Sequence, residues 1–276
     1  AYARPTTILG LTIATGGMRQ AFTAGHAFPD YGDPDGGPRL RVEASDDDRT
    51  YRVVTESFYN GAQRTIAFPA TTAKYFRVVL LEIAPPLVRR GGPTSYVPGI
   101  SLSELVLHDA GTIQRFEAKA FFSQVNDYYT IATVAPPADR VVRKTDVVDL
   151  TARMRPDGRL DWTPPRGNWV VVRLGYSLTG HQNGTAPDDA TGLEVDKLNA
   201  GHVATYMDTY LGMLIEAAGR ENAGAQGLQY LLNDSYEAGF QNWTDDMLEQ
   251  FAKLRGYDPT PWLPTLTGVV VERAAA

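Results

Sequence analysis

The spacing of apolar residues changes along this sequence, and that change constrains the fold more than any other feature. Up to about residue 110, β-branched and apolar residues alternate in short runs such as 6–13 and 75–80. From about residue 196, apolar residues recur every three or four positions. A period of two is typical of strands, and a period near 3.6 is typical of amphipathic helices. The sequence therefore predicts a β-rich first part and a helical last part.

The first part contains six predicted strands with turn residues between them. Clusters of Asp, Gly and Pro at 30–38 and of Asp at 46–48 are turn signals. The strands are predicted at residues 6–13, 40–44, 51–54, 65–68, 75–80 and 103–107. Short strands at close spacing indicate a β-sandwich.

Three runs in this part, RVEASDDDRTYRVV, TIAFPATTAKYFRVVL and SLSELVLHD, resemble the second half of a discoidin-type, galactose-binding-like jelly roll. The resemblance implies a β-sandwich (jelly roll) domain over about residues 1–112. Domains of this kind bind glycans in some proteins and support a neighbouring domain in others. Because no exposed aromatic pair can be located in the sequence, we favour the supporting role.

Residues 113–190 are predicted to form a β-rich connector. Strands are expected at 146–151 and 168–176, on either side of a turn at 155–159. The Asp157-Gly158 pair is the strongest turn signal in this stretch. The pattern indicates a small antiparallel unit that leads into the last part of the chain.

The last part, residues 191–276, has the order helix, strand, helix. The predicted elements are a helix from Asp196 to Ala218, a buried strand at 227–234, and a helix over 245–254 with Thr244 as its N-cap. This order is typical of an (α/β)8 TIM-like barrel. One strand and two helices cannot close a barrel, so we expect a multidomain α+β piece of a longer protein. A mature chain with a frayed tail is the alternative.

The composition argues against several classes of function. A net charge of −6 and a pI near 5.3 argue against a nucleic-acid partner. No apolar run approaches the roughly 18 residues that a membrane span needs, so no membrane association is expected. The chain has no cysteine, which excludes disulfide frameworks, thiolate zinc sites and cysteine nucleophiles.

The sharpest candidate for chemistry is the run Leu231–Glu237, an apolar stretch that ends in a polar cluster. The cluster holds two carboxylates, Asp234 and Glu237. The carboxyl ends of the strands form the active-site face of an α/β barrel. A Glu held partly out of water keeps its proton near neutral pH and can act as a general acid. A loop carboxylate that caps a helix or binds Arg is the alternative.

Two long stretches around this run resemble glycoside hydrolase family 106, the α-L-rhamnosidases. They are NWVVVRLGYSLTGHQNGTAPDDATGLEVDKLNAGHVATYMDTYLG and LLNDSYEAGFQNWTDDMLEQFAKLRGYDPTPWLPTLTGVVV, within about residues 140–272. The resemblance implies a large bacterial enzyme with an interrupted barrel, which removes terminal rhamnose with inversion and uses calcium. It also implies that Glu237 is the general acid and that Asp234 lies at the substrate. The second carboxylate of an inverting enzyme is implied downstream, and Glu272 matches no such motif.

Five further residues are candidates for contact with the substrate. Glu194 and Asp196 precede the first predicted helix and could bind substrate or metal, although Asp196 could instead cap that helix. His181 and Asn183 lie in a Gly-flanked loop that could bind sugar hydroxyls or be an ordinary exposed loop. Trp243 could stack on a sugar ring or pack in a core. No set of six to eight oxygen ligands for calcium can be assembled, so the metal ligands are unassigned.

The expected partner is a rhamnose-containing carbohydrate, and the resemblance implies a periplasmic or secreted bacterial protein. The sequence assigns no oligomeric state. A non-catalytic carbohydrate-binding or structural module is the rival hypothesis.

Overall fold

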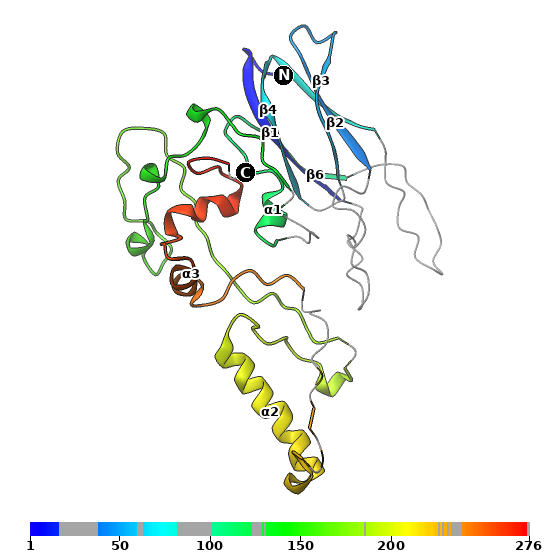
Figure 1. The fold of residues 1–276 in the computed structure, drawn as a ribbon. Coiled ribbons are helices and arrows are strands. Elements are labelled where there is room, and N and C mark those ends of the chain that lie inside the picture. The colour runs from blue at the N-terminus through cyan, green and yellow to red at the C-terminus, as the bar shows by residue number, and fades with distance from the viewer. Residues whose placement is uncertain are drawn as a thin grey trace.

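The computed structural model describes residues 1–16, 38–59, 63–81, 101–122, 129, 131–184, 186–225, 227, 229–230, 232 and 239–274. Two β-sheets lie at one end of the molecule, and the long helix α2 (Ala200–Ala218) projects at the other end (Figure 1). The connector and the short helix α3 (Met247–Arg255) lie between them.

Six antiparallel strands form two three-stranded sheets, with strand orders β4-β1-β6 and β3-β2-β5. The strands are β1 (Thr6–Gly16), β2 (Arg39–Ser45), β3 (Arg52–Phe58), β4 (Arg64–Ala73), β5 (Tyr75–Leu80) and β6 (Ser101–His108). Each corresponds to a strand predicted from the sequence. The alternating pattern was sufficient to locate them, although buried side chains occur only in β1, β2 and β4 among these six strands.

One apolar core joins the two sheets into a β-sandwich. Leu11 and Ile13 of β1 face Leu40 and Val42 of β2, and all four side chains are at most 1% exposed. Tyr59 closes the same cluster. Burying a side chain of this size contributes roughly 1.5–3 kcal/mol, so this core is the main source of the sandwich's stability.

The opposite face of sheet β4-β1-β6 is polar and is partly covered by the short helix α1 (Phe116–Lys119). Thr65 of β4 donates from its hydroxyl to Glu117 Oε1 at 2.6 Å and from its backbone N–H to Oε2 at 3.2 Å. Gln114 Oε1 accepts from the Ala67 N–H at 2.6 Å. Two backbone N–H groups on the edge strand β4 thus find hydrogen-bond acceptors in the side chains of Gln114 and Glu117, which follow β6 in the sequence.

The end of the described chain returns to this region. Val269 pairs with Thr112 and Val271 pairs with Val142 in isolated bridges, and Val270 and Val271 are 1% and 2% exposed. Gly268 has a φ of 84° and lies against the ring of Phe116. The run that ends near residue 271 therefore packs against the connector and α1.

The connector does not contain the two strands that the sequence predicts. Residues 168–176 lie outside any strand, and Val170 is 87% exposed. The stretch predicted as a strand at 146–151 instead overlaps two short 3-10 helices, η3 (Lys144–Asp146) and η4 (Thr151–Arg153). These predictions were wrong because a strand needs a partner edge, and the described part of the connector provides few bridges.

The predicted turn at 155–159 is confirmed. Met154 and Leu160 form a bridge around it, and Gly158 adopts a φ of 82°. The remaining 3-10 helices are η2 (Ala138–Arg140), η5 (Asp188–Ala190), η6 (Arg220–Asn222) and η7 (Thr260–Thr267).

Both predicted helices are present but begin later than expected. Asn199 is the N-cap of α2, because its side chain accepts from the His202 N–H at 3.1 Å, and Gly219 ends the helix as predicted. The prediction that Thr244 caps α3 was wrong, because Asp246 occupies the N-cap position. Gly256, with a φ of 78°, ends α3. In the described chain no helix has both the length and the apolar character that crossing a bilayer requires.

The predicted buried strand at 227–234 lies partly outside the described residues. Of its described members, Tyr230 and Leu232 are 91% and 88% exposed and lie in no strand. A barrel strand is buried by the strands beside it, and no described segment pairs with this one.

Candidate functional site

The two carboxylates of the strongest motif, Asp234 and Glu237, lie outside the described residues. The chain is described again from Gly239, two residues after Glu237. We call residues 239–245 the anchor segment, because this segment is held by contacts from three other parts of the chain. The other five predicted site residues are described.

Asp196 binds the anchor segment through two of its residues, Gln241 and Thr244. Its Oδ2 accepts a hydrogen bond from the Thr244 hydroxyl at 2.6 Å, and Thr244 is 5% exposed. Its Oδ1 accepts from the Leu198 N–H at 2.9 Å and from the Gln241 side-chain amide. Both carboxylate oxygens are therefore used within the chain.

Electrostatics agree with this role for Asp196. Burial acts to raise its pKa, but the hydrogen bonds from Thr244, Leu198 and Gln241 prevail and hold the pKa below its ordinary value. Asp196 therefore stays ionised and joins the loop before α2 to the anchor segment. The alternative that Asp196 caps α2 was wrong, because Asn199 is the cap.

Glu194 lies in the same loop and pairs with Lys197, whose Nζ is 2.5 Å from Glu194 Oε2. Both side chains are about 30% exposed, at 28% and 31%. The backbone N–H of Lys197 donates to Gln241 Oε1 at 3.2 Å. Glu194 thus lies beside the anchor segment with its charge already balanced.

His181 and Asn183 belong to a narrow hairpin-like loop closed by the bridge between Gln182 and Leu193. The Asn183 side chain accepts from the Gly192 N–H at 2.7 Å and donates to the Ala190 carbonyl at 3.0 Å. Its amide therefore serves its own loop. The His181 ring instead lies against Gly239. A Cβ added to Gly239 would be 3.4 Å from Nδ1 of His181.

Trp243 lies in the anchor segment, with its ring centroid 6.2 Å from that of Tyr176. The Tyr176 hydroxyl donates to Asp245 Oδ1 at 2.8 Å, and this bond raises the pKa of Tyr176. Trp243 thus packs against the connector on one side.

The third contact comes from the end of α1. The Asn242 side chain donates to the Ala120 carbonyl at 2.8 Å, and the rings of Phe240 and Phe121 meet edge to face at 5.5 Å. The anchor segment is thus held by the 181–197 loop, by Tyr176 and by the chain after α1.

The structure brings His181, Glu194 and Asp196 to the anchor segment, which itself contains Trp243, whereas the Asn183 side chain bonds within its own loop. Sequence reasoning missed Gln241 and Tyr176. Gln241 is a polar residue four positions after Glu237, and that proximity was the available signal. Tyr176 gave no signal, because its partner Asp245 is 69 residues away.

The described residues do not fit a calcium site. Among them, no group of three or more His, Asp and Glu side chains is placed to hold a metal ion. The nearest candidates are engaged elsewhere, since Asp196 accepts three hydrogen bonds and Glu194 pairs with Lys197. Calcium requires six to eight oxygen ligands.

Comparison with known proteins places this arrangement in a family. The family model described as alpha-L-rhamnosidase, for glycoside hydrolase family 106, matches residues 34–276. A solved rhamnosidase from Novosphingobium sp. PP1Y is 34% identical, with a TM-score of 0.71, and the match covers 98% of this chain. A curated protein of Formosa agariphila, named "Putative beta-glucuronidase", is 34% identical over 160 residues, or 58% of this chain.

The chain spans 23% of the Novosphingobium rhamnosidase and 14% of the Formosa protein. The family match itself extends from the sandwich through the anchor segment to residue 276. The chain therefore belongs to the α-L-rhamnosidase family, glycoside hydrolase family 106.

Proposed function

We propose that this chain is part of a glycoside hydrolase that removes terminal α-L-rhamnose from glycans or glycosides by an inverting mechanism. The observation that carries the proposal is the family match over residues 34–276, together with the 0.71 TM-score to a rhamnosidase of 34% identity. A rhamnose-containing carbohydrate is the proposed partner.

Glu237 is the proposed general acid, with Asp234 at the substrate. A general acid protonates the leaving oxygen in the transition state and must lie within hydrogen-bond distance of it. The anchor segment begins two residues after Glu237 and is fixed through Asp196, Tyr176 and Asn242. Such fixing supports the proposal, because a catalytic side chain must be held in place by its neighbours.

The proposal assigns the second carboxylate of the inverting pair to a residue outside this sequence. The two carboxyl groups of inverting glycosidases are about 6.5–9.5 Å apart, which leaves room for the attacking water. Glu272, the last acidic residue, is not assigned this role because it matches no such motif; its Oε1 accepts a hydrogen bond from the Lys144 N–H at 2.5 Å. Any calcium ion would likewise need ligands beyond the described side chains, which offer no group of three or more.

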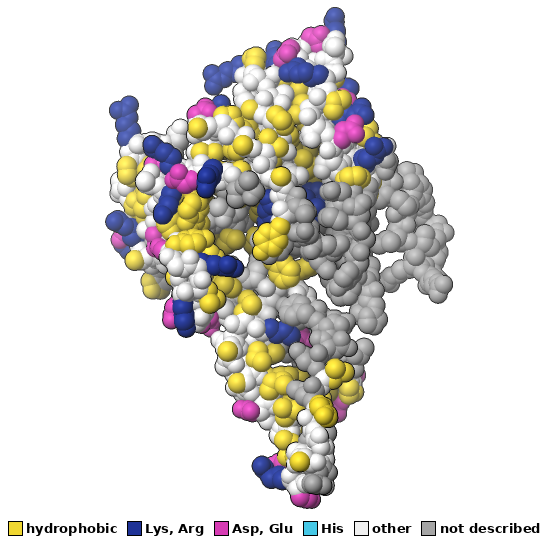
Figure 2. Space-filling view, viewed as in Figure 1, with side chains coloured by type: hydrophobic (Ala, Val, Ile, Leu, Met, Phe, Trp, Pro, Cys, Tyr) yellow, Lys and Arg dark blue, Asp and Glu magenta, His cyan; other side chains and the backbone are white. Residues whose placement is uncertain are grey.

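The proposed domains are a galactose-binding-like jelly roll at 1–112, a connector at 113–190 and part of a TIM-like barrel at 191–276. Exposed apolar residues on α2 support the last of these. Tyr206, Met213 and Leu214 are 49%, 59% and 43% exposed, and apolar side chains are visible on the surface around α2 (Figure 2). A barrel helix would cover them against neighbouring strands. A periplasmic or secreted bacterial location is part of the same proposal.

The test is hydrolysis of aryl α-L-rhamnosides by the protein encoded by the complete reading frame. Glu237→Gln should lower kcat by about 100-fold or more on a poor leaving group such as phenol, because general acid catalysis contributes at least that much. The loss should be much smaller on 2,4-dinitrophenol, which leaves without protonation. Glu216→Gln on α2 is the matched control and should change neither rate.

An equal loss on both leaving groups would show that Glu237 is not the acid. Absence of turnover with saturable rhamnoside binding would instead favour a non-catalytic carbohydrate-binding module.

A further inference from the structure

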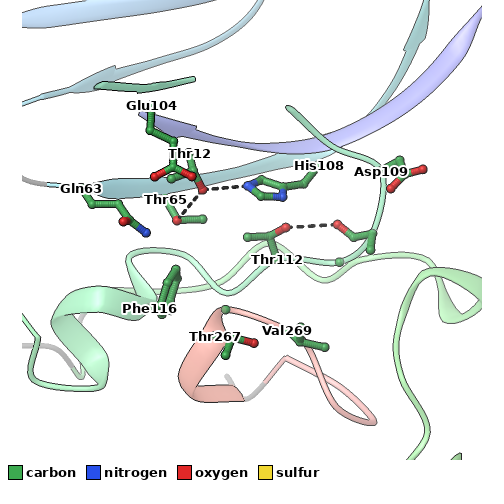
Figure 3. A pocket seen from close by; sticks show the side chains of 13 residues that line it. Thr12, Gln63, Thr65, Glu104, His108, Asp109, Thr112, Phe116, Thr267 and Val269 are labelled. Atoms are coloured by element: carbon green, nitrogen blue, oxygen red, sulfur yellow. Dashed lines mark hydrogen bonds between the residues drawn. The ribbon is translucent and has the colours of Figure 1, made fainter. Parts of the chain in front are cut away.

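A small polar pocket lies on the outer face of sheet β4-β1-β6, and no residue of the anchor segment lines it (Figure 3). Its volume is about 240 Å³. The side chains that matter here are Thr12, Gln63, Glu104, His108, Thr112 and Phe116. We call it the sheet pocket. None of the predicted site residues lines it.

On the sheet side of the pocket, two threonine hydroxyls and the His108 imidazole form a chain of hydrogen bonds that ends on the buried carboxylate of Glu117. The Thr65 hydroxyl donates to Glu117 Oε1 at 2.6 Å, and Glu117 is 6% exposed. Having used its proton, Thr65 must accept from the Thr12 hydroxyl at 2.8 Å. Thr12 must then accept from His108 Nε2 at 2.7 Å. His108 therefore carries its proton on Nε2.

This order leaves the other ring nitrogen of His108 as an acceptor. Burial lowers the pKa of His108, more than the nearby carboxylates Glu104 and Asp109 raise it, so the ring is neutral at neutral pH. His108 Nδ1 makes no hydrogen bond to the described residues. In the close view the ring extends toward Thr12, and Thr112 lies beneath it (Figure 3).

Two more acceptors face the same space. Glu104 has neither a hydrogen bond nor an ion pair among the described residues, and its carboxylate lies above Thr12 (Figure 3). The Thr112 hydroxyl donates its proton to the Ala110 carbonyl at 3.1 Å, so only its lone pairs remain for a ligand. A pocket whose polar groups are mainly acceptors fits a ligand that supplies several O–H donors.

The opposite wall provides an apolar surface. The ring of Phe116 lines the pocket and is backed by Gly268, where an added Cβ would lie 2.6 Å from the ring. An aromatic ring next to converging acceptors suits a sugar, which has C–H groups on one face and hydroxyls around its edge. The pocket volume equals that of about eight water molecules in liquid water. A space of this size suits one monosaccharide unit.

We propose that the sheet pocket binds one neutral saccharide unit through its hydroxyl groups, separately from the catalytic site. Glu104 and Asp109 repel acidic sugars, which makes a neutral unit the better ligand. A metal ion is disfavoured because the described residues offer no group of three ligating side chains. The choice of a saccharide over other hydroxyl compounds rests on the proposed function.

The test is NMR titration of the chain with methyl α-L-rhamnopyranoside, methyl β-D-galactopyranoside and methyl β-D-glucopyranoside. We expect at least one to bind saturably and to shift the imidazole signals of His108. The sequence has four histidines, so a His108→Gln variant assigns those signals. Methyl β-D-glucuronide should bind about tenfold more weakly or not at all.

Glu104→Gln should weaken binding about tenfold, as expected for the loss of one charge-assisted hydrogen bond. Glu104 makes no hydrogen bond or ion pair among the described residues, and its electrostatic interaction is with a neutral His108, so this variant should keep its melting temperature. Glu216→Gln is the matched control and should bind as the parent does. Failure of every neutral glycoside to shift His108, equal binding by Glu104→Gln, or saturation by methylammonium instead would overturn the proposal.

These measurements involve no turnover and are separable from the catalytic proposal. Glu237→Gln should leave binding to the sheet pocket unchanged. Binding without rhamnoside hydrolysis would support the pocket and count against the proposed catalysis, and hydrolysis without binding would do the reverse.

Discussion

Asp47 holds the turn between β2 and β3 through three hydrogen bonds to one carboxylate oxygen. They come from the backbone N–H groups of Thr50 and Arg49, at 2.8 and 2.9 Å, and from the Ser45 hydroxyl at 2.9 Å. These bonds, led by that of Thr50, lower the pKa of Asp47 to about 2. The ionised form is therefore favoured in the folded state.

The pH dependence follows from that direction. A carboxyl whose pKa is lowered by folding stabilises the protein above its unfolded pKa, and that stabilisation is lost as pH falls through the folded pKa. We expect the free energy of unfolding to decline between about pH 4 and pH 2, and Asp47→Asn to show less of this decline. Urea unfolding at several pH values measures it, with Asp188→Asn as control. An NMR titration that places the Asp47 pKa near 4 would contradict the prediction.

Gly268 is required for two reasons, which can be separated by experiment. Its φ is 84°, and an added Cβ would lie 2.6 Å from Phe116 Cδ1. Gly256 has a similar φ of 78° but open space around it. We expect Gly256→Ala to cost about 1 kcal/mol from backbone strain alone and Gly268→Ala to cost about 2–3 kcal/mol. Equal losses in thermal unfolding would show that Phe116 moves aside freely.

At the scale of elements, the anchor segment depends on Asp196. Asp196→Asn places an N–H₂ group or a weaker acceptor opposite the Thr244 hydroxyl. We expect this variant to lose about 1 kcal/mol of local stability and to speed amide hydrogen exchange at Leu198 and in residues 239–245. Thr244→Val should reproduce the change at the anchor segment and leave Leu198 protected. Unchanged exchange in Asp196→Asn would mean that other contacts hold the segment.

Elements with a regular apolar period or a terminating glycine were predictable from the sequence, and elements that depend on a distant partner were not. The six strands and the ends of α2 and α3 followed from alternation and from Gly219 and Gly256. The run at 168–176 has strand-like composition, yet no described strand pairs with it. The sheet pocket was beyond prediction, because Thr12 and His108 are 96 residues apart.

The same reasoning applies to the candidate site. Glu194, Asp196 and Trp243 were identified from their nearness to a helix start or to the motif, and the structure places them within or beside the anchor segment. Their bonding partners could not be foreseen, because Asp196 and Thr244 are 48 residues apart. A charged residue before a helix has several possible partners, and tertiary contacts select among them.

For the molecule as a whole, stability is unevenly distributed. The sandwich core is almost fully buried, whereas α2 has no buried residue. Most of a helix's stability in a protein comes from packing of its apolar face, and α2 buries no such face within the described residues. We expect α2 amides to exchange hydrogen much faster than those of β1 and β2, and urea to unfold α2 first. Exchange protection of α2 equal to that of β1 would show that a further contact, such as self-association, covers it.

The bridge between Thr112 and Val269 has a consequence for insertions and deletions in this chain. It brings together the two ends of a long excursion that contains the connector, α2 and the anchor segment. Because the entropy of closing a loop grows only slowly with its length, residues can be added to or removed from this excursion at little cost to the sandwich. The bridge between Thr112 and Val269 thus lets the chain between these residues change in length while the β-sandwich keeps its structure.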